Sequence, residues 1–282
     1  MKVYPFKIPK PENVNLVYQE DVEIVFYDKL HQHDEIQISY IKKGEGTLLV
    51  ADNFTNYSDG DIFVIGSNIP HAFKSDKKQK ENSVMLSLFF TKDAFGEIFF
   101  YQNDFSELHK LFTKINYGLQ AHQNKARIKT KFNALKSASK LERFIILLEI
   151  LKILSKSKTS SLSNFSYQKN YSDIDGKRLR NVFDYTLENV GEQIALEDIA
   201  SVANMTKNAF CKYFKKRTNK TYINFLNELR IENTCKLLLE NNDLTIPQIA
   251  YSCGFQNISN FNRTFKKLKQ KTPLQFKFQH QS

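Results

Sequence analysis

Three histidines early in the chain could do chemistry together. His31 and His33 are separated by one residue, and His71 follows in a later segment. Neutral imidazoles bind zinc and other divalent ions, and they also hydrogen-bond to buried polar groups or to small molecules. The residues alone leave three uses open: a metal site, hydrogen bonding inside a domain, or polar contact with a small ligand.

A second chemical signal is positive charge near the C-terminus. Residues 204 to 282 carry 14 Lys and Arg against 4 Asp and Glu, a net charge of +10 within a total of +11. The preceding 203 residues carry 27 basic and 26 acidic side chains and are almost neutral. So local an excess indicates nucleic acid or another anionic surface as a partner, with a merely solvated basic face as the alternative.

The same region contains two copies of one unit. At an offset of 50 residues, Ile199 and Ala200 match Ile249 and Ala250, and Asn204 matches Gly254. One inserted residue shifts the offset to 51, at which these pairs match: Phe210 and Phe261, Phe214 and Phe265, Lys215-Lys216 and Lys266-Lys267, Thr221 and Thr272, Phe225 and Phe276. Each copy shows a short helical pattern, a tight turn and a second helix with a basic end, which is the layout of a helix-turn-helix.

Turn and capping residues fall at the expected places in both copies. The turn requires a positive φ, which Gly254 adopts freely and Asn204 tolerates better than most residues. Thr245 and Gln248 predict a capping box at the start of the second copy. Thr206 predicts a cap on the second helix of the first copy.

The second helix of each copy is expected to lie in the major groove of DNA, with a connecting helix from about Tyr222 to Glu240, about 28 Å long, between the two. Two phenylalanines four residues apart face inward in each recognition helix: Phe210 and Phe214, Phe261 and Phe265. The outward side chains are predicted to bind DNA: Lys207, Asn208, Cys211, Lys212, Lys215 and Lys216 in the first copy, and Ile258, Ser259, Asn262, Arg263, Lys266 and Lys267 in the second.

The rest of the chain predicts an α+β organisation. Short β-rich runs separated by turn residues indicate a small barrel or sandwich, and we expect strands at 23–27, 35–41, 47–50, 61–65 and 83–90. Helical spacing follows in 105–119 and 125–154. The predicted domains are a sensor domain with a helical dimerisation segment at 1–155, a linker at 156–175, and a DNA-binding domain at 176–282. The broad apolar face of 141–154 favours a homodimer, with an ordinary intrachain core helix as the alternative.

Composition excludes several classes of protein. Cys211, Cys235 and Cys253 are too few and too widely spaced for a disulfide framework or a zinc knuckle. The longest apolar runs are shorter than the roughly 20 residues of a membrane span, and residues 1–10 lack the pattern of a secretory signal. We expect a cytoplasmic protein that does not bind membranes.

The C-terminal third resembles the AraC/XylS family of transcription regulators. The family signature is similar to IPQIAYSCGFQNISNFNRTFKKLKQKTP at 246–273, and it recurs in weaker form at 199–225. The β-rich region resembles the cupin domain often joined to such units, through HQHDEIQISYIKKGEG at 31–46 and GDIFVIGSNIPHAF at 60–73. In metal-binding cupins a Glu completes the histidine set, whereas this chain carries Gln37 there, so no metal or other cofactor is predicted.

These resemblances imply a sequence-specific regulator with an N-terminal cupin-like β-barrel and two C-terminal helix-turn-helix units. A sugar or other metabolite would bind in the barrel, with His31, His33, Gln37 and His71 as the candidate contacts, and activation would be the more frequent mode. Double-stranded DNA is the main partner, a homodimer is expected, and a contact with RNA polymerase is left open. No catalytic residue is predicted. The rival hypotheses are a metal-dependent cupin enzyme and an architectural DNA binder without an effector.

Overall fold

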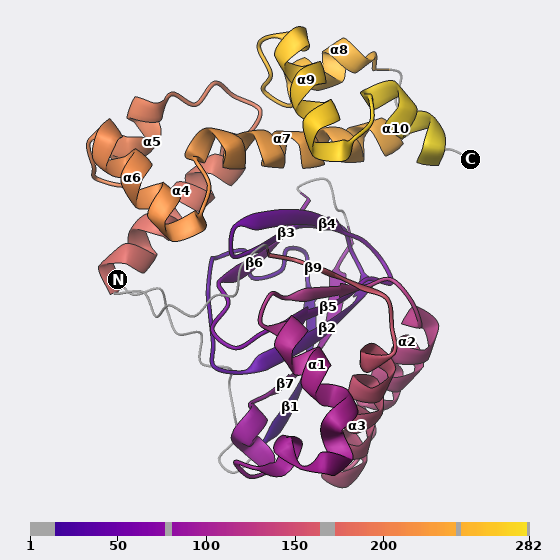
Figure 1. Cartoon of the computed structure of the whole chain (residues 1–282). Coiled ribbons are helices and arrows are strands. Elements are labelled where there is room, and N and C mark those ends of the chain that lie inside the picture. Colours follow the sequence, from indigo (N-terminus) through magenta and orange to yellow (C-terminus); the bar gives the residue numbers. More distant parts are fainter. Residues whose placement is uncertain (1–14, 77–80, 164–172, 241–243, 281–282) are drawn as a thin grey trace. The chain divides into compact units, whose positions relative to one another are not determined.

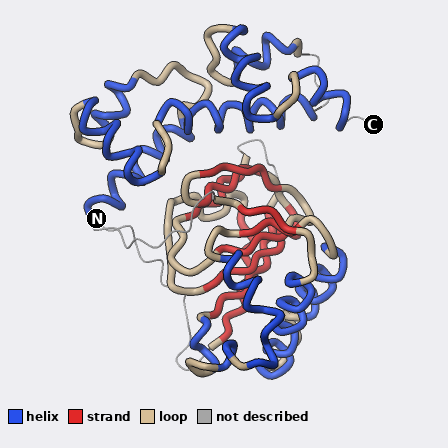
Figure 2. Tube along the Cα trace, viewed as in Figure 1, coloured by secondary structure: helices blue, strands red, loops and turns tan. Residues whose placement is uncertain are grey.

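The computed structural model describes residues 15–76, 81–163, 173–240 and 244–280. The chain divides by its internal contacts into two compact units, one of residues 1–51 and 57–171 and one of residues 52–56 and 172–282. The first is rich in strands and the second is almost entirely helical (Figures 1 and 2). The α+β class is thereby confirmed, whereas the domain and linker boundaries stay predictions.

The strands form two separate sheets in the described part of the chain. The larger sheet has the order β1-β7-β2-β5-β8-β9, and the smaller has the order β4-β3-β6. The bounds are β1 (Leu16–Glu23), β2 (Ile36–Lys43), β3 (Gly46–Val50), β4 (Asn53–Tyr57), β5 (Ile62–Ile65), β6 (His71–Ser75), β7 (Ser83–Phe90), β8 (Leu119–Ala121) and β9 (Thr159–Ser161).

Helices follow the strands along the chain. Three short 3-10 turns, η1 (Lys92–Phe95), η2 (Phe99–Tyr101) and η3 (Asn103–Phe105), precede the longer helices α1 (Ser106–Ile115), α2 (Lys125–Ala134) and α3 (Lys140–Ser155). The helical pattern expected to run through 125–154 is interrupted between α2 and α3. Ser139 begins the new helix there, since it forms a capping box with Glu142.

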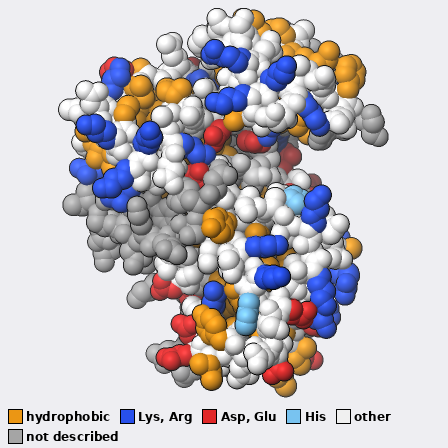
Figure 3. All heavy atoms as spheres, viewed as in Figure 1, with side chains coloured by type: hydrophobic (Ala, Val, Ile, Leu, Met, Phe, Trp, Pro, Cys, Tyr) orange, Lys and Arg blue, Asp and Glu red, His pale blue; other side chains and the backbone are white. Residues whose placement is uncertain are grey.

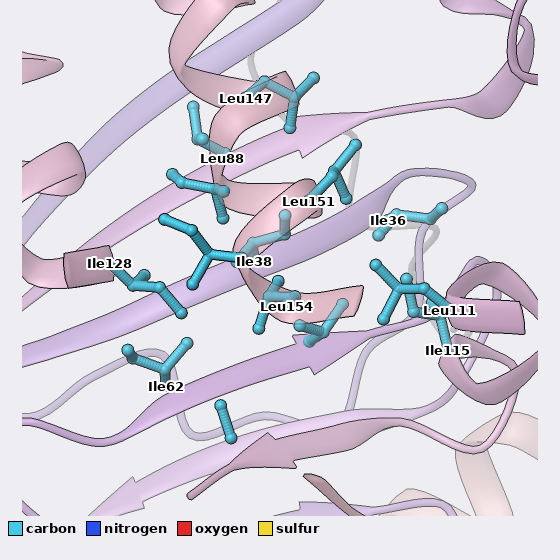
Figure 4. Close-up of a cluster of buried hydrophobic side chains, with 14 of the residues drawn as sticks. Ile36, Ile38, Ile62, Leu88, Leu111, Ile115, Ile128, Leu147, Leu151 and Leu154 are labelled. Atoms are coloured by element: carbon cyan, nitrogen blue, oxygen red, sulfur yellow. The ribbon is translucent and has the colours of Figure 1, made fainter. Parts of the chain in front are cut away.

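Alternate residues of the central strands serve two different cores. Ile38 and Leu88, from one face of the large sheet, pack with Leu111, Leu147 and other residues of α1 to α3 (Figure 4). The opposite face, including the odd-numbered residues of β5, packs against β3 and β6 of the small sheet. Because successive side chains point to opposite faces of a strand, the polar side chains at the odd-numbered positions of β2 lie between the two sheets.

The first unit departs from the expectations in three places. The strand expected at 23–27 is absent apart from Glu23, which is the last residue of β1. Within 24–27 only Phe26 is buried, while Ile24 and Val25 are exposed. The strands form two facing sheets among the described residues, which fits the sandwich that the strand pattern allowed and not a closed form of the cupin-like barrel. Residues 159–161, in the predicted linker, form β9 and pair with β8.

Besides residues 52–56, which include most of β4, the second unit contains seven helices in its described residues: α4 (Asp173–Glu188), α5 (Leu196–Val202), α6 (Lys207–Thr218), α7 (Tyr222–Leu239), α8 (Ile246–Ser252), α9 (Ile258–Lys269) and α10 (Pro273–His280). The 18 residues of α7 confirm the connecting helix, which spans about 27 Å at 1.5 Å per residue.

Helix α7 joins two small cores within this unit. Its N-terminal half contributes Tyr222 and Phe225 to an aromatic cluster with Phe210 and Phe214 of α6. Its C-terminal half, from Ile231 onward, packs with residues of α8 and α9. Each helix-turn-helix is therefore held to a different half of one rigid helix.

Candidate nucleic-acid interface and effector pocket

The first helix-turn-helix is formed by α5 and α6. Asn204, in the turn between them, has a φ of 53°, which confirms the expected left-handed conformation. Thr206 caps α6 by accepting a hydrogen bond from the backbone N–H of Ala209 (3.4 Å). Phe210 and Phe214 are fully buried, as predicted.

The opposite face of α6 presents basic side chains to solvent. Of the residues predicted to bind DNA, five are exposed: Lys207, Asn208, Lys212, Lys215 and Lys216. Cys211 is only partly exposed. Lys207 Nζ lies 2.7 Å from the carboxylate of Glu197 in α5, so this lysine is already paired within the unit.

The second helix-turn-helix is formed by α8 and α9, and its turn is closely surrounded by other parts of the unit. Thr245 and Gln248 form the predicted capping box of α8. Gly254 has a φ of 87°, and a Cβ atom there would lie 2.6 Å from the carbonyl oxygen of Val190 and 2.7 Å from Nε of Arg230. Only glycine fits this turn without displacing its neighbours.

Helix α9 begins at Asn257, whose side-chain oxygen accepts hydrogen bonds from the backbone N–H groups of Ser259 (2.8 Å) and Asn260 (3.0 Å). Five of its predicted DNA-binding residues are exposed: Ser259, Asn262, Arg263, Lys266 and Lys267. The prediction that Ile258 faces outward is wrong, because this side chain is partly buried and packs against the core of the second copy.

Two further polar residues stand beside this face. Gln256 is exposed just before α9, and Asn260 is exposed in its first turn, where its side-chain oxygen accepts a hydrogen bond from Nη2 of Arg263 (3.0 Å). Neither residue was predicted from the sequence to contact DNA, although its position next to the cap residue Asn257 could have indicated it. Arg263 forms no ion pair within the described residues, so its charge is available to a ligand.

Lys and Arg are spread over the visible face of the helical unit (Figure 3). Lys269 does not belong to the available set, because its ammonium contacts the carboxylate of Glu232 in α7. The exposed cations therefore come mainly from the two recognition helices.

A pocket of about 270 Å³ lies in the first unit. Phe26, Tyr27 and other apolar side chains form most of its wall. Asp21 and Glu23, from β1, and His31 line it as well.

All four predicted effector contacts are buried, but only Gln37 and His31 line this pocket, while His33 and His71 contact Gln37. Oε1 of Gln37 lies 3.2 Å from Nε2 of His33 and 3.0 Å from Nε2 of His71. Its amide nitrogen donates to Ser39 Oγ (2.8 Å). Burial lowers the pKa of His33 and holds the pKa of His71 well below its usual range.

The three histidines also meet the basic requirements of a metal site. Their ligand atoms lie within 4.8 Å of one another. Each Nδ1 lies about 3 Å from a backbone carbonyl, an arrangement that leaves Nε2 as the ligating atom. Gln37 adds a neutral oxygen, which binds a divalent ion less strongly than a carboxylate does. The residues fit a three-histidine site in number and orientation.

Comparison with known proteins connects both units to described domains. Residues 199–279 match the model of a helix-turn-helix domain, and residues 25–88 match that of a cupin domain. An uncharacterized HTH-type transcriptional regulator of Bacillus subtilis, YdeC, is 25% identical over 89% of this chain and 86% of its own length.

In two further comparisons, the similarity covers only about a third of one of the two chains. An uncharacterized HTH-type regulator of Staphylococcus aureus strain COL is 23% identical over 86% of this chain, which spans only 31% of that relative. The crystal structure of a transcriptional regulator with an AraC-type DNA-binding domain from Chromobacterium violaceum is 23% identical, covers 36% of this chain and 91% of its own, and has a TM-score of 0.34. Among the described residues, no helix has the length and apolar character that a membrane crossing requires.

Proposed function

We propose that this chain, a DNA-binding transcription regulator of the AraC type with a cupin domain, reads an operator with α6 and α9 under the control of a small molecule bound in its N-terminal pocket. It would act in the cytoplasm on double-stranded DNA, and a contact with RNA polymerase would be one route to activation. The family resemblance suggests a sugar or other metabolite as the effector.

One observation carries the proposal for DNA. Two capped helices, α6 and α9, are both fixed to the rigid helix α7, and both expose basic and short polar side chains on the face opposite their buried phenylalanines. A basic helix with an exposed polar face is the element that enters the major groove in helix-turn-helix proteins. The lysines at the ends of the helices suit phosphates, and the shorter side chains suit base edges.

The effector proposal depends on the pocket that His31 and Gln37 line. A small cavity with mainly apolar walls and a few convergent polar groups is the usual form of a small-molecule site. The histidine cluster behind it favours a second candidate, a metal-dependent cupin enzyme. Metal analysis of the purified chain separates the two, since stoichiometric metal favours the enzyme and a metal-free chain excludes it.

We also propose a homodimer through α3. Leu141 and Ile145 are exposed on this helix, at 69% and 49%, while Leu148 packs partly against the intrachain core. Ile145→Asp therefore tests the dimer with less damage to the fold than Leu148→Asp. Sedimentation equilibrium should show a wild-type dimer and a variant monomer at micromolar concentration, and a wild-type monomer under these conditions would exclude the dimer.

The DNA proposal is tested by the salt dependence of binding. If the exposed lysines and Arg263 neutralise about six phosphates, the slope of log affinity against log salt concentration should be near −5. Genomic footprinting of the tagged chain supplies the DNA sites for the titration. A slope shallower than about −2, or no enriched genomic site, would remove the basis for the proposal.

A further inference from the structure

We propose that the pocket of the first unit binds an organic cation, an amine carried on a small apolar body. The inference rests on the proposed function in one respect, that this pocket is the effector site. It replaces the sugar that the family resemblance suggests with a ligand class argued from the pocket itself.

The charges of the pocket favour a positively charged ligand. Asp21 and Glu23 are two residues apart in β1, so both side chains project from the same face of the strand, and both line the pocket. Among the described residues that line it, none is Lys or Arg. A carboxylate ligand would meet two like charges here, whereas an ammonium group would pair with them.

Two side-chain nitrogens beside these carboxylates already donate within the protein. Nδ1 of His31 lies 2.8 Å from the carbonyl oxygen of Lys29 and donates to it. The amide nitrogen of Gln37 is engaged by Ser39. A ligand that donates several hydrogen bonds, as an ammonium group does, complements this set.

Aromatic walls suit both parts of such a ligand. Phe26, Tyr27, Phe73 and Phe89 line the pocket. Their faces attract cations, and their area shelters an apolar body from water. The volume of about 270 Å³ lies just below the usual range for small-molecule sites, so the ligand is small.

The test compares three probes with one carbon skeleton and different charge: 3-phenylpropylamine, 3-phenylpropanol and 3-phenylpropionate. Each is titrated calorimetrically at pH 7 into the full chain, which has been treated with a chelator so that no metal occupies the histidine cluster. The amine should bind at least about tenfold more tightly than the alcohol, and the carboxylate should bind most weakly.

Variants of β1 test whether the preference for the amine depends on the carboxylates of this strand. Asp21→Asn should weaken amine binding about fivefold, the scale of one partly exposed ion pair, and leave the alcohol unaffected. Glu23→Gln, at a more exposed position, should weaken amine binding by a smaller factor. It replaces Asp21→Asn in the test if that variant is unstable. Asp104→Asn makes the same charge change at an exposed residue outside the pocket and should change nothing.

An amine that binds no more tightly than the alcohol, or shows no binding at millimolar concentration, overturns the inference. So does a preference for the carboxylate, or an equal response of Asp21→Asn and Asp104→Asn. Because these titrations contain no DNA, their failure leaves the DNA proposal intact. A failure to bind any operator would in turn leave the amine preference standing.

Discussion

The two helix-turn-helix units of the second domain share a plan but differ in how their turns and ends are fixed. Helix α5 begins at Ala195, which makes no side-chain cap, whereas α8 begins with the capping box of Thr245 and Gln248. The turn of the first copy uses Asn204, and that of the second uses a glycine enclosed by Val190 and Arg230. The second copy is therefore the more strictly defined.

The recognition helices differ in the same sense. Helix α9 has Asn257 as a cap with two hydrogen bonds, and short polar side chains at Ser259 and Asn262 follow directly. Helix α6 has a single long cap bond and pairs Lys207 with Glu197. We infer that the second copy supplies most of the base reading and the first mainly grips the DNA backbone.

The largest expected difference between the copies lies in their turns. Gly254→Ala should cost about 3 kcal/mol or more, because its Cβ would overlap backbone and guanidinium atoms at a positive φ. Asn204→Ala, at the matching turn, should cost about 1 kcal/mol. Chemical denaturation of both variants measures these losses. Equal losses would mean that the two turns are equally constrained, which would contradict the proposed difference between the two copies.

A smaller difference is expected at the starts of the first helices. Thr245→Ala should lower the free energy of unfolding by about 1 kcal/mol, because the capping box of α8 is lost. The first copy has no such cap to lose, so Ala195→Ser should instead stabilise it by up to about 1 kcal/mol. The melting temperatures of the two variants should move in opposite directions, and a shift of both in one direction would contradict this account.

Much of the second domain could be predicted from the sequence because its signals are local. The spacing of Phe210 and Phe214, the cap at Thr206 and the turn at Gly254 each act within a few residues. Ile258 was misplaced because the apolar contact that buries it comes from packing against the rest of the second copy.

The pocket was only partly predictable because its negative wall depends on long-range pairing. The histidine motif drew attention to His31 and Gln37, which do line the pocket. Asp21 and Glu23 were not singled out, since β1 shows weak apolar alternation and the strand was expected to begin at Glu23. Their position depends on the register of β1 against β7, in which Asp21 pairs with Met85.

The central claim is that α9 reads base sequence, and selection over randomised operators tests it most directly. Wild type is compared with Asn262→Ala, Arg263→Ala and Lys267→Ala under one salt condition. Loss of a base-reading side chain should cost about 1 to 3 kcal/mol and relax the preference at one position of the operator, whereas loss of Lys267 should weaken all sequences alike. If all three variants return the wild-type motif with uniformly lower affinity, α9 does not read sequence and the account is wrong.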